Sequence, residues 1–514
     1  MKKLIALLLA LLMVMSLVAC GAKAPAEEPA DEPADAPAVD APADEPAEEP
    51  ADEPAEEPAE EREHVTLQFY NRCPEQPNED YVWGVLNEYL EEKLNTTVEW
   101  HFLGGTFSDK VSVMINSGEY YDAVWTSNWQ NDYATNVARG AYLDLTGLLN
   151  DYPAMYESMP EGFWEATKIS GKIYAVPCQQ IAARTPHMNV ITEYAEAFGM
   201  TLEDQFTRKN MVDFEDYLQF CKDNYGALGS APEASEWALY CGYEFLAGQT
   251  GCVAIKNDDP TCTVVNFYAT PEFKAMCEEM VYLYSKGLID DAAFEDTDYL
   301  RSNMISGRIS LKCGGTYKPG GDVEDSNSYG IQMRHSPHGT SLLTTGGIIA
   351  TMWGVSANTE HPDRVMEVLE LLCTDSYVMN MLSYGIEGEN YTVTDGLVEM
   401  IPDSGYNPGA SWALGNTFLT YPMVGMPVTV WEDTYELNAT ADVSKIIGFT
   451  IDISPVELEV TNVTNVYEQY KNVINGNLPL EETLAEFNAK LEDAGIQTLI
   501  AEAQSQIDAF LASK

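Results

Sequence analysis

The sequence predicts an α/β fold whose folded part is divided into at least two lobes. Strand-like segments with alternating apolar residues take turns with segments whose apolar residues recur at helical spacing, which is typical of a mostly parallel sheet covered by helices. About 450 residues remain once an atypical N-terminal region is set aside. A chain of that length exceeds what one compact core usually holds, so two lobes or more are expected.

The alternation is clear at the start of the folded part, and the end has a helical pattern only. The pattern predicts strands over 65–70, 96–100 and 123–125, and helices over 81–93, 107–115, 480–493 and 496–512. Parallel sheets hold ligands in the loops beyond the carboxyl ends of their strands. The loop that follows Trp125 is therefore a candidate binding loop. Gly495 separates the last two helices.

The N-terminus has the features of a secretion signal. Lys2 and Lys3 precede an apolar run over 4–15 that is too short to span a bilayer. Small residues then lead to Cys20 and a glycine, an arrangement that resembles the lipobox of bacterial lipoproteins. The resemblance implies that residues 1–20 are a signal peptide and that Cys20 carries acyl chains such as palmitate, which anchor the protein to the extracellular face of the cell membrane. An ordinary signal peptide that happens to end near a cysteine is the alternative.

Residues 21–63 repeat a unit of acidic residues, proline and alanine. This segment holds nine prolines, seventeen acidic residues and no aromatic residue. Such a composition cannot bury a core, and its prolines and like charges favour an extended chain that would reach roughly 130 Å at about 3.1 Å per residue. We interpret the segment as a disordered stalk that holds the folded part away from the membrane.

The folded part is strongly acidic. The formal net charge of the chain is −55, and about −42 of it belongs to residues 64–514. No lysine or arginine cluster stands out there, so nucleic acids, anionic lipids and polyanions are poor ligands on electrostatic grounds. Beyond the signal region, no apolar run approaches the length needed to span a membrane. Neutral or cationic ligands remain.

The cysteines do not form a recognisable framework. Nine follow Cys20, at positions 73, 178, 221, 241, 252, 262, 277, 313 and 373. Their odd number and scattered spacing argue for buried, reduced thiols, with one or two disulfides as the alternative. A hairpin centred on the turn at 257–260 would pair Cys252 with a residue near 265, so Cys252 and Cys262 need not face each other.

Motifs of common enzyme classes are absent from the sequence. It contains no Gly-x-Ser-x-Gly elbow, Walker loop, His-Glu-x-x-His or dinucleotide fingerprint. His335 and His338 are the one histidine cluster, and no nearby cysteine or carboxylate pattern completes a metal site. We expect no catalytic residue, no cofactor and no bound metal.

Several segments resemble extracellular solute-binding proteins of ABC sugar importers, in the order and spacing of that family. They are NSGEYYDAVW at 116–125, GAYLDL at 140–145, GKIYAVP at 171–177, NMISGRIS at 303–310 and SANTEHPDR at 356–364. Later segments are similar to a LipO-like lipoprotein subgroup whose C-terminal region is a domain of unknown function. These are YGIEGENY at 384–391, GFTIDISPV at 448–456, LEDAGI at 491–496 and AEAQSQID at 501–508. The resemblance extends over nearly the whole folded part.

The resemblance implies a two-lobed, type II-like periplasmic-binding-protein fold with a hinged cleft and a C-terminal helical extension. Lobe 1 would comprise residues 64–180 with about 342–375, lobe 2 residues 181–341 with about 376–450, and the helical segment residues 451–514. The chain would cross between the lobes near 177–181 and again near 332–341. A monomer of this kind captures a sugar, an oligosaccharide or another small polar solute, closes on it and delivers it to the permease subunits of an ABC transporter.

A sugar site combines aromatic rings, which stack on apolar C–H faces, with amide and carboxylate groups, which bind hydroxyls. The candidates of these types in loops or beside expected strand ends are Asn128, Trp129, Gln179, Gln180, Tyr317, Trp353, Tyr384, Glu387, Trp412 and Asn416. Each has a structural alternative. Trp353 lies in a buried-looking strand, where core packing is an equal explanation. Tyr384 and Glu387 could instead fix a turn.

Two other functions fit the same composition. A cell-surface glycoside hydrolase needs two placed carboxylates, and acidic residues abound, but no pair stands out. A polysaccharide-binding adhesin or sensor that is not coupled to transport would need no closure between lobes. An enzyme would release products from an oligosaccharide, whereas a binding protein would return it intact.

Overall fold

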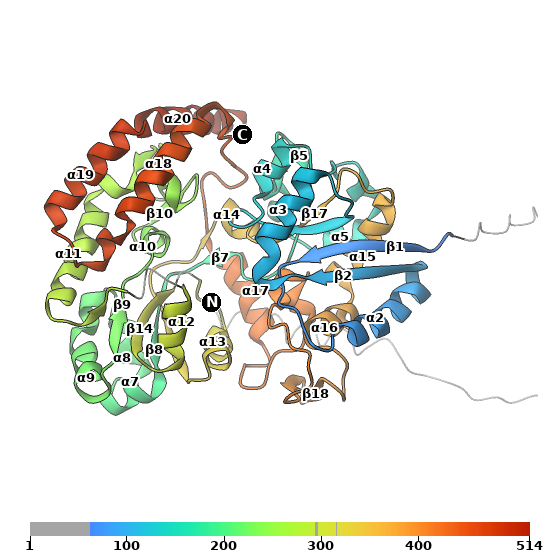
Figure 1. Ribbon diagram of the computed structural model, residues 1–514, viewed down its shortest axis with the longest axis horizontal. Coiled ribbons are helices and arrows are strands. Elements are labelled where there is room, and N and C mark those ends of the chain that lie inside the picture. The colour runs from blue at the N-terminus through green and yellow to red at the C-terminus, as the bar shows by residue number, and fades with distance from the viewer. Residues whose placement is uncertain (1–61, 293–296, 315) are drawn as a thin grey trace, which may run out of the picture. The chain divides into compact units, whose positions relative to one another are not determined.

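The computed structural model describes residues 62–292, 297–314 and 316–514, which belong to one compact unit. The predicted signal peptide, the lipidation site Cys20 and all but the last two residues of the predicted stalk lie outside the described residues. Two five-stranded sheets, each with its own hydrophobic core, organise this unit (Figure 1). The predicted α/β, two-lobed fold class is confirmed.

The first sheet has the strand order β2 (Thr96–Phe102), β1 (Val65–Asn71), β3 (Ala123–Thr126), β17 (Met352–Val355), β6 (Ala175–Pro177). β1 pairs in parallel with β2 and β3, and β17 runs antiparallel to both of its neighbours. Leu67 and Phe69 are fully buried on one face of β1, as the alternating pattern predicts. Four of the five strands therefore run in the same direction, as predicted for a mostly parallel sheet, and β17 alone runs the opposite way.

Helices on both faces complete lobe 1. α2 (Glu79–Leu94) and α3 (Phe107–Ser117) begin and end within two residues of the predicted helices. The remaining elements of this lobe are α4 (Tyr133–Ala138), α5 (Pro153–Glu157), α6 (Glu161–Ala166), β4 (Lys168–Ile169), β5 (Lys172–Ile173), α14 (Thr345–Ile348), α15 (Pro362–Thr374), α16 (Ser376–Tyr384), β18 (Tyr391–Thr394) and β19 (Leu397–Met400). Trp125, Trp164 and Trp353 are among the largest side chains buried in its core.

The structure places α16 in lobe 1, whereas the sequence assigned 376–450 to lobe 2. Val378 and Leu382 are fully buried in the first core, and so is Leu414 further along the chain. The physical reason is that an apolar helix face packs on the nearest exposed core, and the chain does not leave lobe 1 until after residue 440. Only the end of the predicted segment, from about Ile446, packs in the second core.

The second sheet has the order β13 (Ile289–Asp290), β9 (Leu228–Ser230), β14 (Ile309–Gly314), β8 (His187–Ile191), β15 (Met333–Pro337). β13, β9 and β14 are parallel, and β8 is antiparallel to β14 and β15. The other elements of this lobe are α7 (Thr192–Phe198), α8 (Leu202–Thr207), α9 (Glu215–Tyr225), α10 (Ala234–Tyr240), β10 (Tyr243–Phe245), β11 (Val253–Lys256), β12 (Val265–Asn266), α11 (Pro271–Ser285), α12 (Thr297–Ile305) and α13 (Gly321–Tyr329).

Three chain crossings join the lobes, and they pair with one another as a small sheet. β7 (Ala183–Arg184) leads from the first sheet to the second, β16 (Leu342–Leu343) leads back, and β20 (Asp442–Val443) leads out again after α17 (Val430–Thr440). The first crossing lies a few residues beyond the predicted 177–181, and the second begins directly after the predicted 332–341. Asn438 fixes the first crossing, because its Oδ1 accepts the Ala182 and Ala183 N–H groups at 2.9 Å each.

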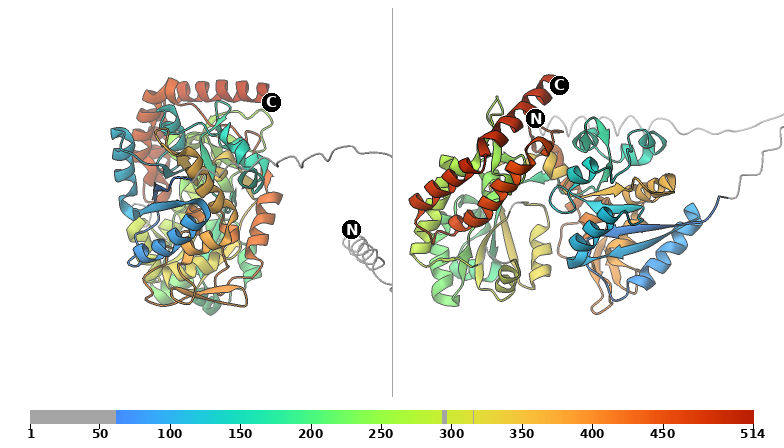
Figure 2. Two further views of the ribbon diagram at one scale, coloured as in Figure 1. Left: turned by 90° about the vertical axis from the view of Figure 1, so that its right-hand side faces the viewer. Right: turned by 45° about the horizontal axis from the view of Figure 1, so that its top comes forward.

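The C-terminal segment packs as helices on the second core. α18 (Glu457–Tyr470), α19 (Leu480–Asp493) and α20 (Ile496–Ser513) lie along helices of lobe 2, red beside green in Figure 2. The predicted helices at 480–493 and 496–512 are thus found, with Gly495 between them at φ 94°. Gly476 also has a positive φ, and a Cβ there would meet the Met280 carbonyl oxygen of α11 at 2.4 Å, so this close approach requires glycine.

The nine cysteines after Cys20 are free thiols, eight of them buried, as expected, and Cys241 partly exposed. Cys252 precedes β11, and its carbonyl accepts the N–H of Phe267, so the hairpin pairs it close to the predicted partner. None of the helices in the described part of the chain is long and apolar enough to cross a membrane.

Candidate ligand-binding site

A tryptophan cluster lies at the carboxyl ends of β1 and β3, where the sequence predicted a binding loop. Trp129 is 54% exposed, although its Nε1 donates to the Ala350 carbonyl at 2.8 Å. Ser127 holds the loop, since its Oγ accepts the N–H groups of Trp129 and Gln130 at 3.2 and 2.9 Å. The indole therefore has a fixed edge while about half of the residue's surface remains exposed, which suits stacking on a ligand.

Trp412 completes the cluster from a distant part of the chain. Its ring centroid lies 6.4 Å from that of Trp129 and 6.3 Å from that of buried Trp125. Thr351 ties the loop in place: its hydroxyl donates to the Trp412 carbonyl at 3.2 Å and accepts the Trp125 Nε1–H at 2.8 Å. Trp129 and Trp412 together form a partly exposed aromatic surface supported by the core.

Arg72, which sequence analysis missed, lies over these rings. Its Cζ is 5.0 Å from the ring centroids of both Trp129 and Trp412, and its Nε donates to Gln130 Oε1 at 2.9 Å. Half-burial lowers the pKa of Arg72, but an arginine stays charged at neutral pH. The position directly after β1, at the carboxyl edge of a parallel strand pair, was the signal that could have found it.

The predicted amide residues lie near this cluster or beside the first crossing. Asn128 is exposed, and its Nδ2 donates to the Gly346 carbonyl at 3.1 Å. Gln179 is only 3% exposed and donates to Ser158 Oγ at 3.2 Å. Gln180 is half-buried, and its carbonyl accepts Asn438 Nδ2 at 2.9 Å. Asn128 is the member of this group whose side chain reaches solvent beside the tryptophans.

Of the four other predicted residues, three take structural positions in lobe 1 and the fourth is exposed. Trp353 is 1% exposed within the core, with its Nε1 bound to the Leu414 carbonyl at 2.8 Å. Asn416 is 8% exposed and caps a short helical turn. Tyr384 packs on Tyr391 and donates to a backbone carbonyl, and burial raises its pKa to about 12. Glu387 is exposed. The structure does not bring these four side chains to the tryptophan cluster.

Lobe 2 places charged and aromatic side chains at the carboxyl edge of its own sheet. Tyr317, predicted from the sequence, is half-buried after β14, and its ring centroid lies 6.3 Å from that of His187. Arg184 of the first crossing, Glu236 of α10 and Lys312 of β14 interact electrostatically with one another or with shared neighbours. Sequence analysis did not single out these three charged residues.

Burial changes the protonation of this charged group. Burial raises the pKa of Glu236 to about 7, so a substantial fraction of its carboxyl groups is neutral near physiological pH. Burial alone would lower the pKa of Lys312, but the ionisable groups around it, Glu236 first and then Tyr329, Asp325 and Glu233, together outweigh burial and the pKa is raised. Burial lowers the pKa of His187 to about 3, which keeps that imidazole neutral. Lobe 2 can therefore offer both hydrogen-bond donors and a protonatable acceptor.

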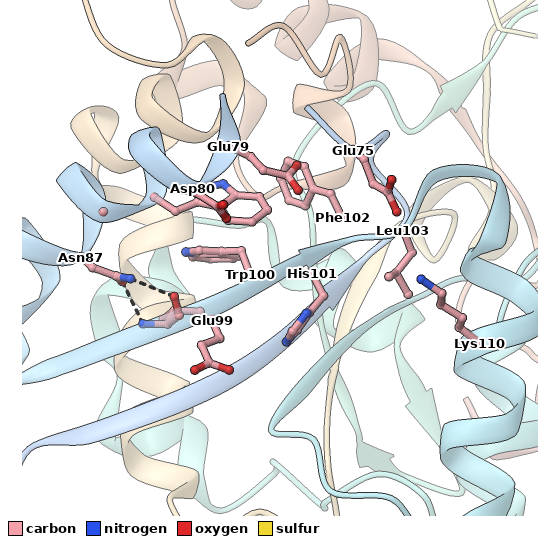
Figure 3. A pocket seen from close by; sticks show the side chains of 13 residues that line it. Glu75, Glu79, Asp80, Asn87, Glu99, Trp100, His101, Phe102, Leu103 and Lys110 are labelled. Atoms are coloured by element: carbon pink, nitrogen blue, oxygen red, sulfur yellow. Dashed lines mark hydrogen bonds between the residues drawn. The ribbon is translucent and has the colours of Figure 1, made fainter. Parts of the chain in front are cut away.

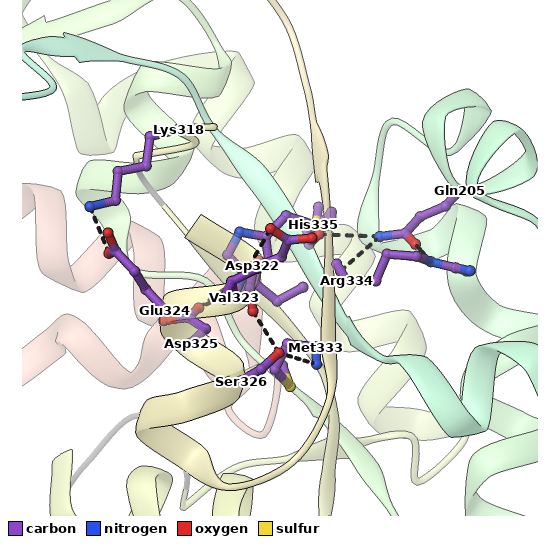
Figure 4. Close-up of polar contacts among 12 residues, drawn as sticks. Gln205, Lys318, Asp322, Val323, Glu324, Asp325, Ser326, Met333, Arg334 and His335 are labelled. Atoms are coloured by element: carbon purple, nitrogen blue, oxygen red, sulfur yellow. Dashed lines mark hydrogen bonds and ion pairs between the residues drawn. The ribbon is translucent and has the colours of Figure 1, made fainter. Parts of the chain in front are cut away.

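A polar network around α13 and β15 borders this group (Figure 4). Asp325 accepts a hydrogen bond from His335 at 3.0 Å, which holds the pKa of Asp325 below its usual range despite burial. Lys318 pairs with Glu324 at 2.6 Å, and Arg334 donates to Gln205 at 2.7 Å. The network orders the side chains next to Tyr317.

The histidine cluster does not assemble with other metal ligands in the described residues, where no group of three or more His, Cys, Asp or Glu side chains is placed to hold a metal ion. Burial lowers the pKa of His338 to about 4, and neither ring nitrogen has a hydrogen-bond partner. His335 pairs with Asp325 instead.

Known proteins resemble this chain in sequence and in fold. Residues 445–512, which span α18 to α20, match a family described as a domain of unknown function, DUF3502. Over 466 residues the chain is 25% identical to a carbohydrate ABC transporter substrate-binding protein of Streptococcus pneumoniae serotype 4, covering 87% of this chain and 91% of the relative. The family resemblance predicted from the sequence is confirmed.

Solved structures agree on the fold. The N-glycan transport solute-binding protein NgtS from Streptococcus pneumoniae matches with a TM-score of 0.76 at 22% identity, over 87% of this chain and 99% of that one. A solute-binding protein from Bifidobacterium longum infantis, described as HMO-binding and associated with an ABC transporter, matches with a TM-score of 0.61 at 15% identity over 87% and 99% of the two chains. These likenesses extend across both lobes and the C-terminal helices.

Proposed function

We propose that this protein is a membrane-anchored, extracellular solute-binding protein that captures a sugar or oligosaccharide and delivers it to the permease of an ABC transporter. The observation that carries the proposal is the tryptophan cluster, which offers a partly exposed aromatic surface at the carboxyl edge of the first sheet. The names of the relatives point the same way: one is a carbohydrate substrate-binding protein, and NgtS has been solved with Man1GlcNAc.

Each lobe would contribute different contacts to the ligand. Sugar C–H faces would stack on Trp129 and Trp412, while Arg72 and Asn128 would donate hydrogen bonds to hydroxyl groups at the edge of the ring. Tyr317 and the charged group of lobe 2 would contact the ligand from the other side. Closure about the three paired crossings would bring these surfaces together and signal occupancy to the permease.

The remaining parts of the proposal rest on the sequence. Cys20 would carry the lipid anchor, the segment 21–63 would serve as the stalk, and the protein would act as a monomer at the extracellular face of the membrane. A protein of this kind performs no chemistry on its ligand. The relatives named above are binding proteins, which supports that view.

The test is a ligand screen on residues 62–514, which form one compact unit. We would measure thermal shifts with mannose–N-acetylglucosamine oligosaccharides, milk oligosaccharides and glucans. One class should give a saturable rise in Tm. At a ligand concentration a hundredfold above Kd, binding should stabilise the folded state by about 3 kcal/mol. Chromatography of the recovered sugar separates the alternatives. An intact ligand supports a receptor, and cleaved products would establish a glycoside hydrolase instead.

A further inference from the structure

Three charged side chains, all partly exposed, gather at the carboxyl edge of the sheet of lobe 2. Lys312 lies near the end of β14, and Glu236 lies on α10, which begins shortly after the end of the parallel neighbour β9. Arg184 precedes β8, whose first residue His187 is opposite Gly314, the last residue of β14. The ends of three adjacent strands therefore bring the three charges within electrostatic reach of one another or of shared neighbours.

The ammonium of Lys312 has no hydrogen-bond or ion-pair partner among the residues that the structure describes. Lys318, a few residues along the chain, shows the usual arrangement, with its Nζ 2.6 Å from a carboxylate oxygen of Glu324. Glu236 is the group that most favours the charge of Lys312, yet the two side chains are too far apart to form an ion pair. Lys312 therefore offers N–H donors that the protein does not use.

The carboxylate of Glu236 is also largely unused. Within the described part of the chain, its one hydrogen bond comes from the N–H of Glu233 at 3.3 Å, in the capping box that begins α10. That bond occupies Oε2 and leaves Oε1 as an acceptor. A donor and an acceptor of opposite charge thus lie near each other without bonding. Because a partly buried charge without a partner is unfavourable, a ligand that supplies both partners would form strong hydrogen bonds.

The groove of about 500 Å³ between α2 and β2 provides a contrast (Figure 3). The Asn87 amide there bonds both main-chain groups of Val98, with its Nδ2 donating at 3.0 Å and its Oδ1 accepting at 2.8 Å. The ring of His101 is bonded to Gln68 at 2.7 Å. These groups are occupied within the protein, unlike the Lys312 ammonium and Oε1 of Glu236.

The charges at this edge of lobe 2 select the chemical class of the ligand. A carboxylate on the ligand would be repelled by Glu236 and by Glu233, whose side chain is exposed. An amine on the ligand would be repelled by Lys312 and Arg184. A hydroxyl group is neutral and both donates and accepts, so two neighbouring hydroxyl groups of a sugar can satisfy the carboxylate and the ammonium together.

We propose that Glu236 and Lys312 determine ligand specificity by binding two neighbouring hydroxyl groups of a neutral sugar unit. One hydroxyl donates to Oε1 of Glu236, and the hydroxyl beside it accepts from Nζ of Lys312. This inference rests on the proposed function and names the class of sugar that the site selects. Tyr317 follows β14 at the same edge and offers its ring to the C–H face of that unit. A sugar that lacks either hydroxyl leaves a charge unpaired, so discrimination against it is large.

The first test compares sugars by titration calorimetry on residues 62–514. Neutral milk oligosaccharides are compared with their sialylated forms, which add a carboxylate, and chitin oligosaccharides with chitosan oligosaccharides, which carry amines. Neutral mannose–N-acetylglucosamine oligosaccharides complete the panel. The tightest-binding probe should be neutral, and a charged form should bind at least tenfold more weakly than its neutral counterpart. Tighter binding of a sialylated or amine-bearing sugar would overturn the proposal.

The second test removes each charge in turn. Lys312→Met keeps an unbranched side chain without the ammonium, and Glu236→Gln keeps the shape of the side chain without the negative charge. Each should weaken binding of the tightest-binding neutral probe at least tenfold. A monodeoxy form of that probe without the hydroxyl that Lys312 binds should bind equally to Lys312→Met and to the unmodified protein. Lys286→Met is the matched control and should bind normally, because Lys286 is an exposed lysine of the same lobe that pairs with Glu215 at 3.2 Å.

A measurement without sugar separates binding from a structural role. Because Lys312 has no partner in the described residues, Lys312→Met should keep the Tm of the unmodified protein when no sugar is present. Unchanged sugar affinity in Lys312→Met and Glu236→Gln, with or without a fall in Tm, would overturn this inference alone. If the unmodified protein binds none of the sugars, the proposed function fails together with this inference, so the two failures are distinguishable.

Discussion

The two lobes share a sheet topology but differ in the chemistry at their carboxyl edges. Lobe 1 exposes indole rings that are backed by the core and covered by one arginine, with Trp129 and Trp412 at its centre. Lobe 2 gathers side chains that titrate, with Glu236 and Lys312 set back from solvent. Stacking depends on surface area and changes little with pH, whereas hydrogen bonding by a protonatable carboxyl does change. We infer that lobe 1 supplies most of the affinity and lobe 2 supplies discrimination between ligands.

The largest expected effect tests whether lobe 1 supplies most of the affinity. Trp129→Ala combined with Trp412→Ala should weaken sugar binding roughly 30-fold, since two stacking contacts are together worth about 2 kcal/mol. Titration calorimetry with the ligand from the screen measures this. Tyr284→Ala, at a 36% exposed tyrosine on α11, is the control and should bind normally. If the affinity of the double variant for the sugar falls by less than twofold, the sugar does not bind at this cluster.

The next effect tests the connection between the lobes. Asn438→Ala would leave the Ala182 and Ala183 N–H groups and the Gln180 carbonyl without their partner, at a cost of about 2 kcal/mol in the free energy of unfolding. Denaturant unfolding measures it. Asn465→Ala, at an exposed position of α18, should have almost no effect. Equal stability of both variants would mean that the crossings are held by their strand pairing alone.

A smaller effect concerns the arginine over the tryptophans. Arg72→Met keeps an unbranched side chain but removes the charge and its hydrogen bonds, and should weaken sugar binding by about 1 kcal/mol, or roughly fivefold. The affinity is compared with that of Lys110→Met, which removes a charge on α3 instead. Tighter binding by Arg72→Met would show instead that the guanidinium occupies the stacking face and must be displaced by the ligand.

A pH-dependent effect tests the lobe 2 half of the comparison. Folding raises the pKa of Glu236 from 4.5 to about 7, so this group contributes stability below pH 4.5 that is lost as the pH rises through 7. The difference in Tm between the unmodified protein and Glu236→Gln should therefore shift in favour of the variant across that window, by about 2 °C for each kcal/mol. His187 and His338 also titrate, but both proteins share them. If this difference in Tm does not change with pH, Glu236 does not titrate in this window.

Local features were predictable because they depend on neighbouring residues. The strand at 65–70, the helix at 81–93 and the helices on either side of Gly495 appear with nearly the predicted bounds. The binding loop after Trp125 was predicted from one rule about strand ends, and it holds the exposed Trp129. Whether Trp129 and the other candidate residues contact a ligand stays a prediction.

Other features depend on contacts between distant segments, which periodicity does not encode. The apolar strand around Trp353 made core packing an equal explanation there, but only the fold shows that Trp353 is buried and Trp412 partly exposed. In the sequence, nothing distinguishes Arg72 from other loop residues. Only the fold places it over the rings of Trp129 and Trp412, which come from other parts of the chain. The lobe assignment of α16 was wrong for the same reason. The sequence of an apolar helix face does not indicate which of two cores the helix packs on.

By itself, the sequence determined the α/β class, the family resemblance, the helical C-terminus and the acidic character of the chain. These properties follow from composition, from short-range periodicity and from motifs made of contiguous residues. Only the tertiary structure decided how three crossings pair and which tryptophans reach solvent. Each of these depends on which distant surfaces meet, and that is set by the packing of whole elements rather than by any one segment.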